Sequence, residues 1–207
     1  MHTNNYKNII ILGNSKKFIN LIKNNFIYRS LNILSWRNHK ILENQIKKAD
    51  LIIVCGFDYQ SCEYNYKKFY KVNISKPFDL IKKFYKKETT IIYINTILKN
   101  KYTLSRYYFA KHKLNEMLIK NFKNLISMEI PTIITDGKVD VFGSKIAKII
   151  FQILIFLKIV DCINYKNLKK KIISCLKYYK HKDSLKINGI FLKVPRNIYL
   201  DRILRFL

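Results

Sequence analysis

The stretch that decides the fold is IIILGNSKKFI, residues 9–19. Its continuous apolar run is typical of a short strand that is buried on both faces, as strands of parallel sheets are. Gly13, Asn14 and Ser15 then form a turn, and from Lys16 onward the apolar residues follow helical spacing. The pattern predicts a strand over residues 8–12 and a helix over 16–28, which is the opening unit of an α/β fold.

The same alternation continues along the chain. Further short apolar runs predict strands at residues 31–34, 49–56, 90–94 and 125–129. The segments between them predict helices at residues 41–48, 62–72, 77–86 and 105–122. Strands separated by helices of this length indicate a doubly wound parallel sheet with helices on both faces, a Rossmann-like α/β fold.

The last third of the chain predicts a smaller unit. Two helices are expected at residues 146–160 and 167–180, and a late strand at 188–194. We therefore expect a core over residues 1–135 and a small C-terminal lobe over 136–207, both in the same compact domain.

Composition narrows the function classes. The 207 residues are 49% hydrophobic, enough for one domain with a substantial core. The net charge of +27 suits nucleic acid or an anionic membrane surface, but the lysines are scattered and rise together with Asn, Ile and Tyr, as A/T-rich codons would produce. We expect no specific nucleic-acid partner.

No apolar run approaches the roughly 20 residues of a membrane span. The four cysteines have no zinc-site spacing, which suits buried thiols in a cytoplasmic protein.

Tyr107 and Lys111 are one turn apart on a predicted helix, so their side chains point the same way. Leu114 and Leu118 continue that face, which places the lysine on the inward, apolar side. A lysine in this position either extends its ammonium group outward or has a chemical role. One such role is to lower the pKa of a neighbouring phenol, so that Tyr107 exchanges a proton near neutral pH.

Six segments, in this order, resemble the short-chain dehydrogenase/reductase superfamily, and within it the extended branch of nucleotide-sugar epimerases, dehydratases and reductases. They are IIILGNSKKFI, ADLIIVCG, FYKVNISKPFDLI, TTIIYINT, YYFAKHKLNE and MEIPTI. The family's Asn, Ser/Thr, Tyr and Lys pattern falls on Asn73, Thr96, Tyr107 and Lys111. The resemblance implies that Tyr107 is a general acid/base on a carbinol or carbonyl oxygen, and that Lys111 lowers its pKa and holds the nicotinamide ribose. It implies that Thr96 orients the substrate oxygen and that Asn73 supports a water-mediated proton path. From the residues alone, Thr96 could instead cap a helix or turn, and Asn73 could be a plain turn residue.

The nucleotide loop departs from the family pattern of three glycines. Only Gly13 is kept; the second glycine falls near Lys16 or Lys17, and the third at Ile19 or Asn20. Helix-terminal N–H groups and Lys16 still favour phosphate. The end of the second strand is positive and carries no carboxylate, which favours NADP over NAD. The residues expected to hold the cofactor are Gly13, Asn14, Ser15, Lys16, Ser35, Arg37, Cys55, Gly56 and Lys111.

Two functions follow from the resemblance. The first is an NAD(P)-dependent oxidoreductase, epimerase or dehydratase that acts on a nucleotide-linked sugar for surface polysaccharide. The second is a catalytically impaired relative that serves as a binding or regulatory subunit. Arg196 and Arg202 would contact a substrate diphosphate, although Arg202 could instead pair with a surface carboxylate. Family members often dimerise through the helix that carries the tyrosine, so a homodimer is allowed but not required.

Overall fold

A parallel sheet forms the centre of the molecule. The computed structural model describes residues 5–35, 47–96, 106–130, 132–135, 138–139, 145–157, 162–180 and 192–193. In these residues the main sheet has the order β2-β1-β3-β4-β5-β9, and each neighbouring pair is parallel. Its strands are β1 (Asn5–Leu12), β2 (Ile27–Leu34), β3 (Leu51–Val54), β4 (Thr90–Thr96), β5 (Leu125–Ile130) and β9 (Leu192–Lys193).

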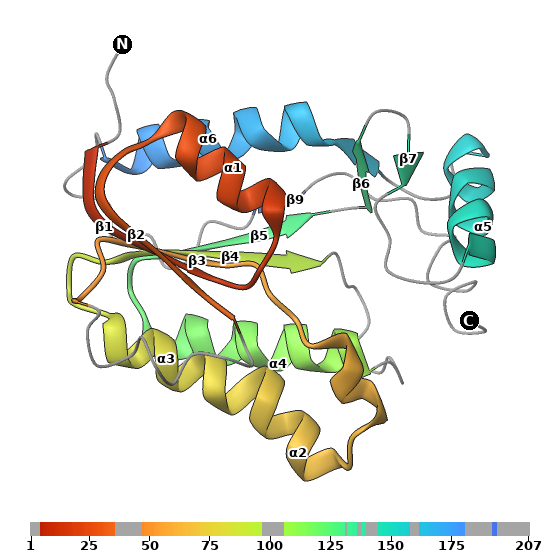
Figure 1. The fold of residues 1–207 in the computed structure, drawn as a ribbon, viewed down its shortest axis with the longest axis horizontal. Coiled ribbons are helices and arrows are strands. Elements are labelled where there is room, and N and C mark those ends of the chain that lie inside the picture. Colours follow the sequence, from red (N-terminus) through yellow and green to blue (C-terminus); the bar gives the residue numbers. More distant parts are fainter. Residues whose placement is uncertain are drawn as a thin grey trace.

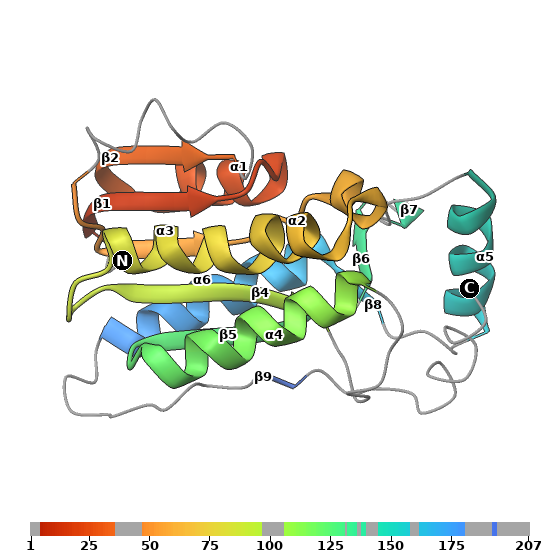
Figure 2. The same ribbon diagram turned by 90° about the horizontal axis from the view of Figure 1, so that it is seen from below.

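Helices cover both faces of this sheet (Figures 1 and 2). One face carries α1 (Lys16–Asn25) and α6 (Tyr165–Lys180). The opposite face carries α3 (Lys76–Phe84) and α4 (Arg106–Asn121), with the short α2 (Tyr66–Tyr70) at one end. The prediction of a Rossmann-like α/β fold is therefore confirmed.

Alternate residues of each strand point to opposite helical layers, as the pleat of a strand requires. In β1, Ile9 and Ile11 pack in the cluster that holds α1 and α6, whereas Ile10 and Leu12 pack in the cluster that holds α3 and α4. All four side chains are fully buried. Burial on both faces explains why the sequence of β1 is apolar without interruption.

The edge strand β2 differs from its prediction. It begins at Ile27, four residues earlier than expected, and α1 ends at Asn25 because Phe26 is already extended. Its first residues are exposed or half-buried, since β2 lies at the edge of the sheet. A half-exposed strand has no continuous apolar run, which is why the pattern detected only its last four residues.

The two helices expected at residues 62–72 and 77–86 are joined. A five-residue π-helix, Lys71–Ser75, connects α2 directly to α3, and a short 3₁₀-helix, Tyr59–Glu63, precedes them. Asn73 lies in the π-helix and is not a turn residue. The helix expected at residues 41–48 falls mostly outside the described residues, and residues 47 and 48 are not helical.

The C-terminal part contains a second, small sheet that the sequence did not predict. Its order is β7-β6-β8, formed by β6 (Thr132–Thr135), β7 (Lys138–Val139) and β8 (Cys162–Asn164). The helix α5 (Lys145–Phe156) connects β7 to β8. Leu168 and Ile172 of α6 pack in the same buried cluster as α1, so α6 completes the core of the main sheet. Cys162 is exposed, unlike the buried thiol that we expected.

Candidate functional site

The strand order reverses at β1, which has β2 on one side and β3 on the other. Ligands of open α/β sheets bind at such a switch point, beyond the carboxyl ends of the strands. Gly13 follows β1 there, with a φ of +124°. A Cβ on Gly13 would lie 2.5 Å from the backbone N of Gly56, so the loops after β1 and β3 approach each other closely only because residue 13 is glycine.

Hydrogen bonds hold these loops together. The N–H of Gly13 donates to the carbonyl of Leu34 over 2.8 Å. The carbonyl of Leu12 accepts from the N–H groups of Cys55 and Gly56 over 2.9 and 3.0 Å. The ends of β1, β2 and β3 therefore form one rigid floor for the candidate site.

The amino terminus of α1 opens above this floor. The side chain of Ser15 makes no capping hydrogen bond, and neither Asp nor Glu lies in the first turn. Asn14 and Lys16 are exposed. First-turn N–H groups without a side-chain cap favour an anion, as the sequence predicts for a phosphate.

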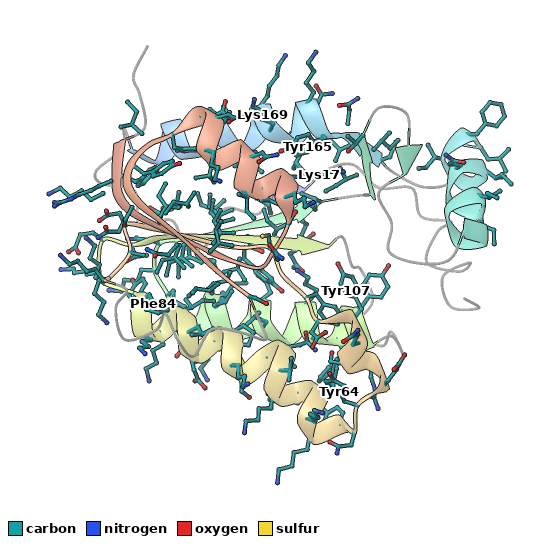
Figure 3. The ribbon with its side chains drawn as sticks, in the orientation of Figure 1. Lys17, Tyr64, Phe84, Tyr107, Tyr165 and Lys169 are labelled. Atoms are coloured by element: carbon teal, nitrogen blue, oxygen red, sulfur yellow. The ribbon has the colours of Figure 1, made fainter. Side chains whose placement is uncertain are left out.

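Lys17 faces the C-terminal part of the chain. Its Nζ donates to Oγ1 of Thr135 over 2.5 Å and lies 5.7 Å from the ring centroid of Tyr165. The hydroxyl of Tyr165 in turn donates to the Lys17 carbonyl. Figure 3 shows Lys17 and Tyr165 side by side between α1 and α6. These contacts join the first turn of α1 to β6 and α6, and no local sequence pattern predicts them.

Lys111 is buried, as its helical spacing predicted, with 6% of its surface exposed. Its Nζ donates to the Ile94 carbonyl over 2.9 Å and to the Gly56 carbonyl over 3.4 Å. Burial lowers the pKa of Lys111 to about 8, partly offset by the neighbouring Cys55. The ammonium group is therefore fixed where the loops after β3 and β4 begin.

Tyr93 contacts Lys111, and the sequence did not predict it as a residue of the site. It is fully buried in β4, its hydroxyl donates to the Lys111 carbonyl over 2.9 Å, and its ring centroid lies 5.2 Å from the Lys111 Nζ. Burial raises the pKa of the Tyr93 phenol well above its ordinary value. The sequence carries one signal for this residue: Tyr93 is the only residue with a polar side chain between Ile91 and Ile94. A phenol that is buried among isoleucines requires a hydrogen-bond partner.

Tyr107 lies on the same side of the site. It is half-buried, one turn before Lys111, and its ring meets that of Phe57 edge-on with centroids 4.7 Å apart. In Figure 3 it lies at the end of α4 nearest the carboxyl edge of the sheet. Because Lys111 bonds to Gly56 and Tyr107 packs on Phe57, adjacent residues of one loop bring both side chains together.

Asn73 is buried and holds that same loop. Its Oδ1 accepts from the Asp58 N–H over 2.9 Å, and its Nδ2 donates to Ser61 Oγ and to the Phe69 carbonyl. The π-helix that carries Asn73 is a feature often found at functional sites. Its amide thus fixes the chain just beyond Phe57, next to Tyr107.

Cys55 lies between Lys111 of α4 and the backbone of Ser15 at the start of α1. Burial raises the pKa of its thiol to about 11, although the Lys111 ammonium and the Ser15 N–H favour the thiolate. The thiol therefore stays protonated at neutral pH and is not an activated nucleophile.

The remaining candidates are placed only in part. Ser35 is half-buried directly after β2, and Thr96 is the last residue of β4, where only its backbone is described. Arg37, Arg196 and Arg202 lie outside the described residues. In the portion of the chain that the structure describes, no group of His, Cys, Asp and Glu could hold a metal ion, and no helix is long and apolar enough to cross a bilayer.

Solved structures share this architecture. No family model and no curated protein matches the chain. A capsular polysaccharide assembling protein, CapF, from Staphylococcus aureus is 14% identical with a TM-score of 0.57. The match covers 96% of this chain and 56% of the CapF chain. A dTDP-4-dehydrorhamnose reductase from Bacillus anthracis, in complex with NADP, is 10% identical with a TM-score of 0.58. The match covers 97% of this chain and 80% of the reductase chain.

A short chain dehydrogenase family protein from Francisella tularensis is 12% identical with a TM-score of 0.56, and the match covers 94% of this chain and 99% of that one. Identities this low establish the fold alone. Together with the parallel sheet and its switch point, they show that this chain has a Rossmann-like α/β fold.

Proposed function

We propose that this protein is an NAD(P)-dependent enzyme of the reductase, epimerase or dehydratase type, which acts on a nucleotide-linked sugar in surface-polysaccharide biosynthesis. The observation that carries the proposal is the buried ammonium group of Lys111, held by two carbonyls at the carboxyl edge of the sheet with Tyr107 one turn away. The shared fold with a reductase crystallised with NADP and with a capsular polysaccharide protein supports the cofactor and the pathway.

The described residues fit a dinucleotide. Gly13 has a backbone conformation that residues with a side chain rarely adopt. The first turn of α1 has no acidic residue and no side-chain cap that would compete with a phosphate. Gly13, Asn14, Ser15 and Lys16 would hold the pyrophosphate. Ser35, Arg37, Cys55 and Gly56 would line the adjoining walls, and the positive loop at Arg37 favours NADP. When bound, the nicotinamide supplies or accepts a hydride.

The protein's own groups would handle the proton. Tyr107 would transfer it to or from a carbinol or carbonyl oxygen of the substrate. A pKa of about 8 leaves Lys111 mostly protonated at neutral pH, so its charge is available to stabilise the phenolate and to hold the ribose. Thr96 would orient the substrate oxygen. Asn73 would support the proton path through the loop that its amide holds, and Arg196 and Arg202 would bind the substrate diphosphate.

A second candidate is a relative that has lost catalysis and serves as a binding or regulatory subunit. The loop after β1 favours it, because the second glycine of a dinucleotide loop is replaced near Lys16 or Lys17. The Lys17 side chain is also bound to Thr135. A crowded loop would exclude the pyrophosphate while leaving the fold intact.

Titration with NADPH and with NADH, followed by nicotinamide fluorescence, separates the two candidates. The enzyme proposal predicts a saturable shift that weakens in Lys111→Met. It predicts no change in Lys113→Met, which alters an exposed lysine of the same helix that pairs with Glu116. Absence of any shift at millimolar cofactor would favour the binding subunit. Tight, salt-sensitive binding to generic DNA would instead point to a basic nucleic-acid-binding protein.

A further inference from the structure

The helix α5 and the residue that follows it, Leu157, expose a row of large apolar side chains. Ile149, Ile153, Phe156 and Leu157 are 54%, 52%, 84% and 56% exposed. Their spacing of three and four residues places them on one face of the helix. Single exposed apolar residues are ordinary, but a contiguous apolar face marks an interaction surface.

This face stands apart from the core. Figures 1 and 2 both place α5 at the far end of the molecule, beyond the edge toward which the strands point. None of the described side chains of α5 belongs to a buried cluster of the fold. The exposed row is therefore not covered by the helices or strands that the structure describes.

The basic sequence of α5 and of the segments after it favours an anionic occupant. Residues 141–160 contain Lys145, Lys148 and Lys158 and no acidic residue. The following helix, α6, has six lysines and no acidic residue, and its Lys166, Lys170 and Lys171 are exposed. With a net charge of +27, two copies of this chain repel each other, whereas an anionic bilayer attracts it.

The length of α5 decides how it would meet a bilayer. Twelve residues make a helix of about 18 Å, against a hydrocarbon core of about 30 Å. A helix of this length that meets a bilayer lies in the plane of the interface, with its apolar face among the acyl chains.

We propose that α5 is a membrane-surface anchor that docks the protein on bilayers rich in anionic lipid. The apolar face formed by Ile149, Ile153 and Phe156 of α5 and by the following Leu157 enters the interfacial layer, and the basic charge of the chain holds it there. This inference does not depend on the proposed enzymatic function, because it concerns a different part of the molecule.

Sedimentation with lipid vesicles tests the anchor. The full chain is expected to bind vesicles of phosphatidylcholine with phosphatidylglycerol, and to bind pure phosphatidylcholine much more weakly. The double variant Ile153→Glu/Phe156→Glu is expected to lose binding by at least about tenfold, because both side chains contribute to apolar burial. A control is Ile119→Glu, which places one such carboxylate at a 41%-exposed isoleucine of α4 and should bind normally.

Three results would overturn the proposal. The first is no vesicle binding by the full chain at low salt. The second is binding that both α5 substitutions leave unchanged, which would assign the attraction to lysine charge alone. The third is a dimer, seen by analytical ultracentrifugation, that the α5 substitutions dissociate, since a second copy would then cover the face. The single variant Phe156→Ser, at the most exposed position, repeats the test with little risk to folding.

Discussion

The two sides of the candidate site use their lysines in opposite ways. On the α4 side, Lys111 is buried and bound to two strand-end carbonyls. On the α1 side, Lys16 is exposed and Lys17 is bound to Thr135. Burying an ammonium group costs free energy, whereas an exposed one costs little. In a chain with 40 basic residues, the buried lysine is therefore the more specific mark of chemistry.

The largest expected effect is on turnover. Tyr107→Phe removes the proposed acid/base and should lower kcat by about 10²- to 10⁴-fold, while NADPH affinity stays nearly the same. Turnover of a nucleotide-sugar substrate and NADPH titration measure the two quantities separately. Tyr108→Phe, which alters the adjacent ring, is the control and should retain activity. Unchanged turnover in Tyr107→Phe would mean that Tyr107 is not the acid/base, and that the α4 side has no more chemical role than the α1 side.

The next effect concerns the backbone floor beneath both sides. Gly13→Ala would bring a Cβ within 2.5 Å of the Gly56 N, at a φ of +124°. We expect the free energy of unfolding to fall by about 3 kcal/mol, from strain and overpacking together. Urea denaturation measures it. Ser15→Ala is the matched control, because the Ser15 side chain makes no capping bond, and it should change stability little. Equal stability of both variants would mean that the loops separate at little cost.

The third effect is a pH dependence that belongs to the α4 side alone. Burial lowers the pKa of Lys111 from 10.5 to about 8. Between these values the unfolded chain keeps the proton that the folded protein has lost, so stability rises with pH, by about 1.4 kcal/mol per pH unit at most. The Cys55 thiol opposes this rise above its ordinary pKa of 9.0, because its folded pKa is raised to about 11. The rise is therefore clearest between pH 8 and 9.

Urea denaturation at both ends of that window checks the assignment. The wild type should gain about 1 kcal/mol over Lys111→Met between pH 8 and 9. Lys113→Met should follow the wild type, because Lys113 is exposed on the outer side of the same helix. A difference that does not change with pH would mean that the Lys111 ammonium is not buried in solution.

The sequence predicted these features unevenly, for physical reasons. Burial on both faces produces continuous apolar runs, so β1, β3 and β4 were recognised, and helical spacing alone placed Lys111 inward. The edge strand β2 and the small sheet of β6, β7 and β8 bury only part of their surface and have no such run. Hydrogen bonds between distant residues leave no local pattern. Tyr93 reaches the Lys111 carbonyl across 18 residues, and Lys17 reaches Thr135 across 118.

The smallest expected effects distinguish the two lysines of the α1 side. Lys17→Met removes the hydrogen bond to Thr135 and should lower the free energy of unfolding by about 1 kcal/mol, with NADPH affinity nearly unchanged. Lys16→Met should leave stability unchanged but weaken NADPH binding several-fold and reduce its salt dependence, because Lys16 is the exposed lysine at the helix terminus. Urea denaturation and NADPH titration at two salt concentrations measure both variants. If the losses were exchanged, Lys17 would be the phosphate ligand, and its bond to Thr135 would have to break when the cofactor binds.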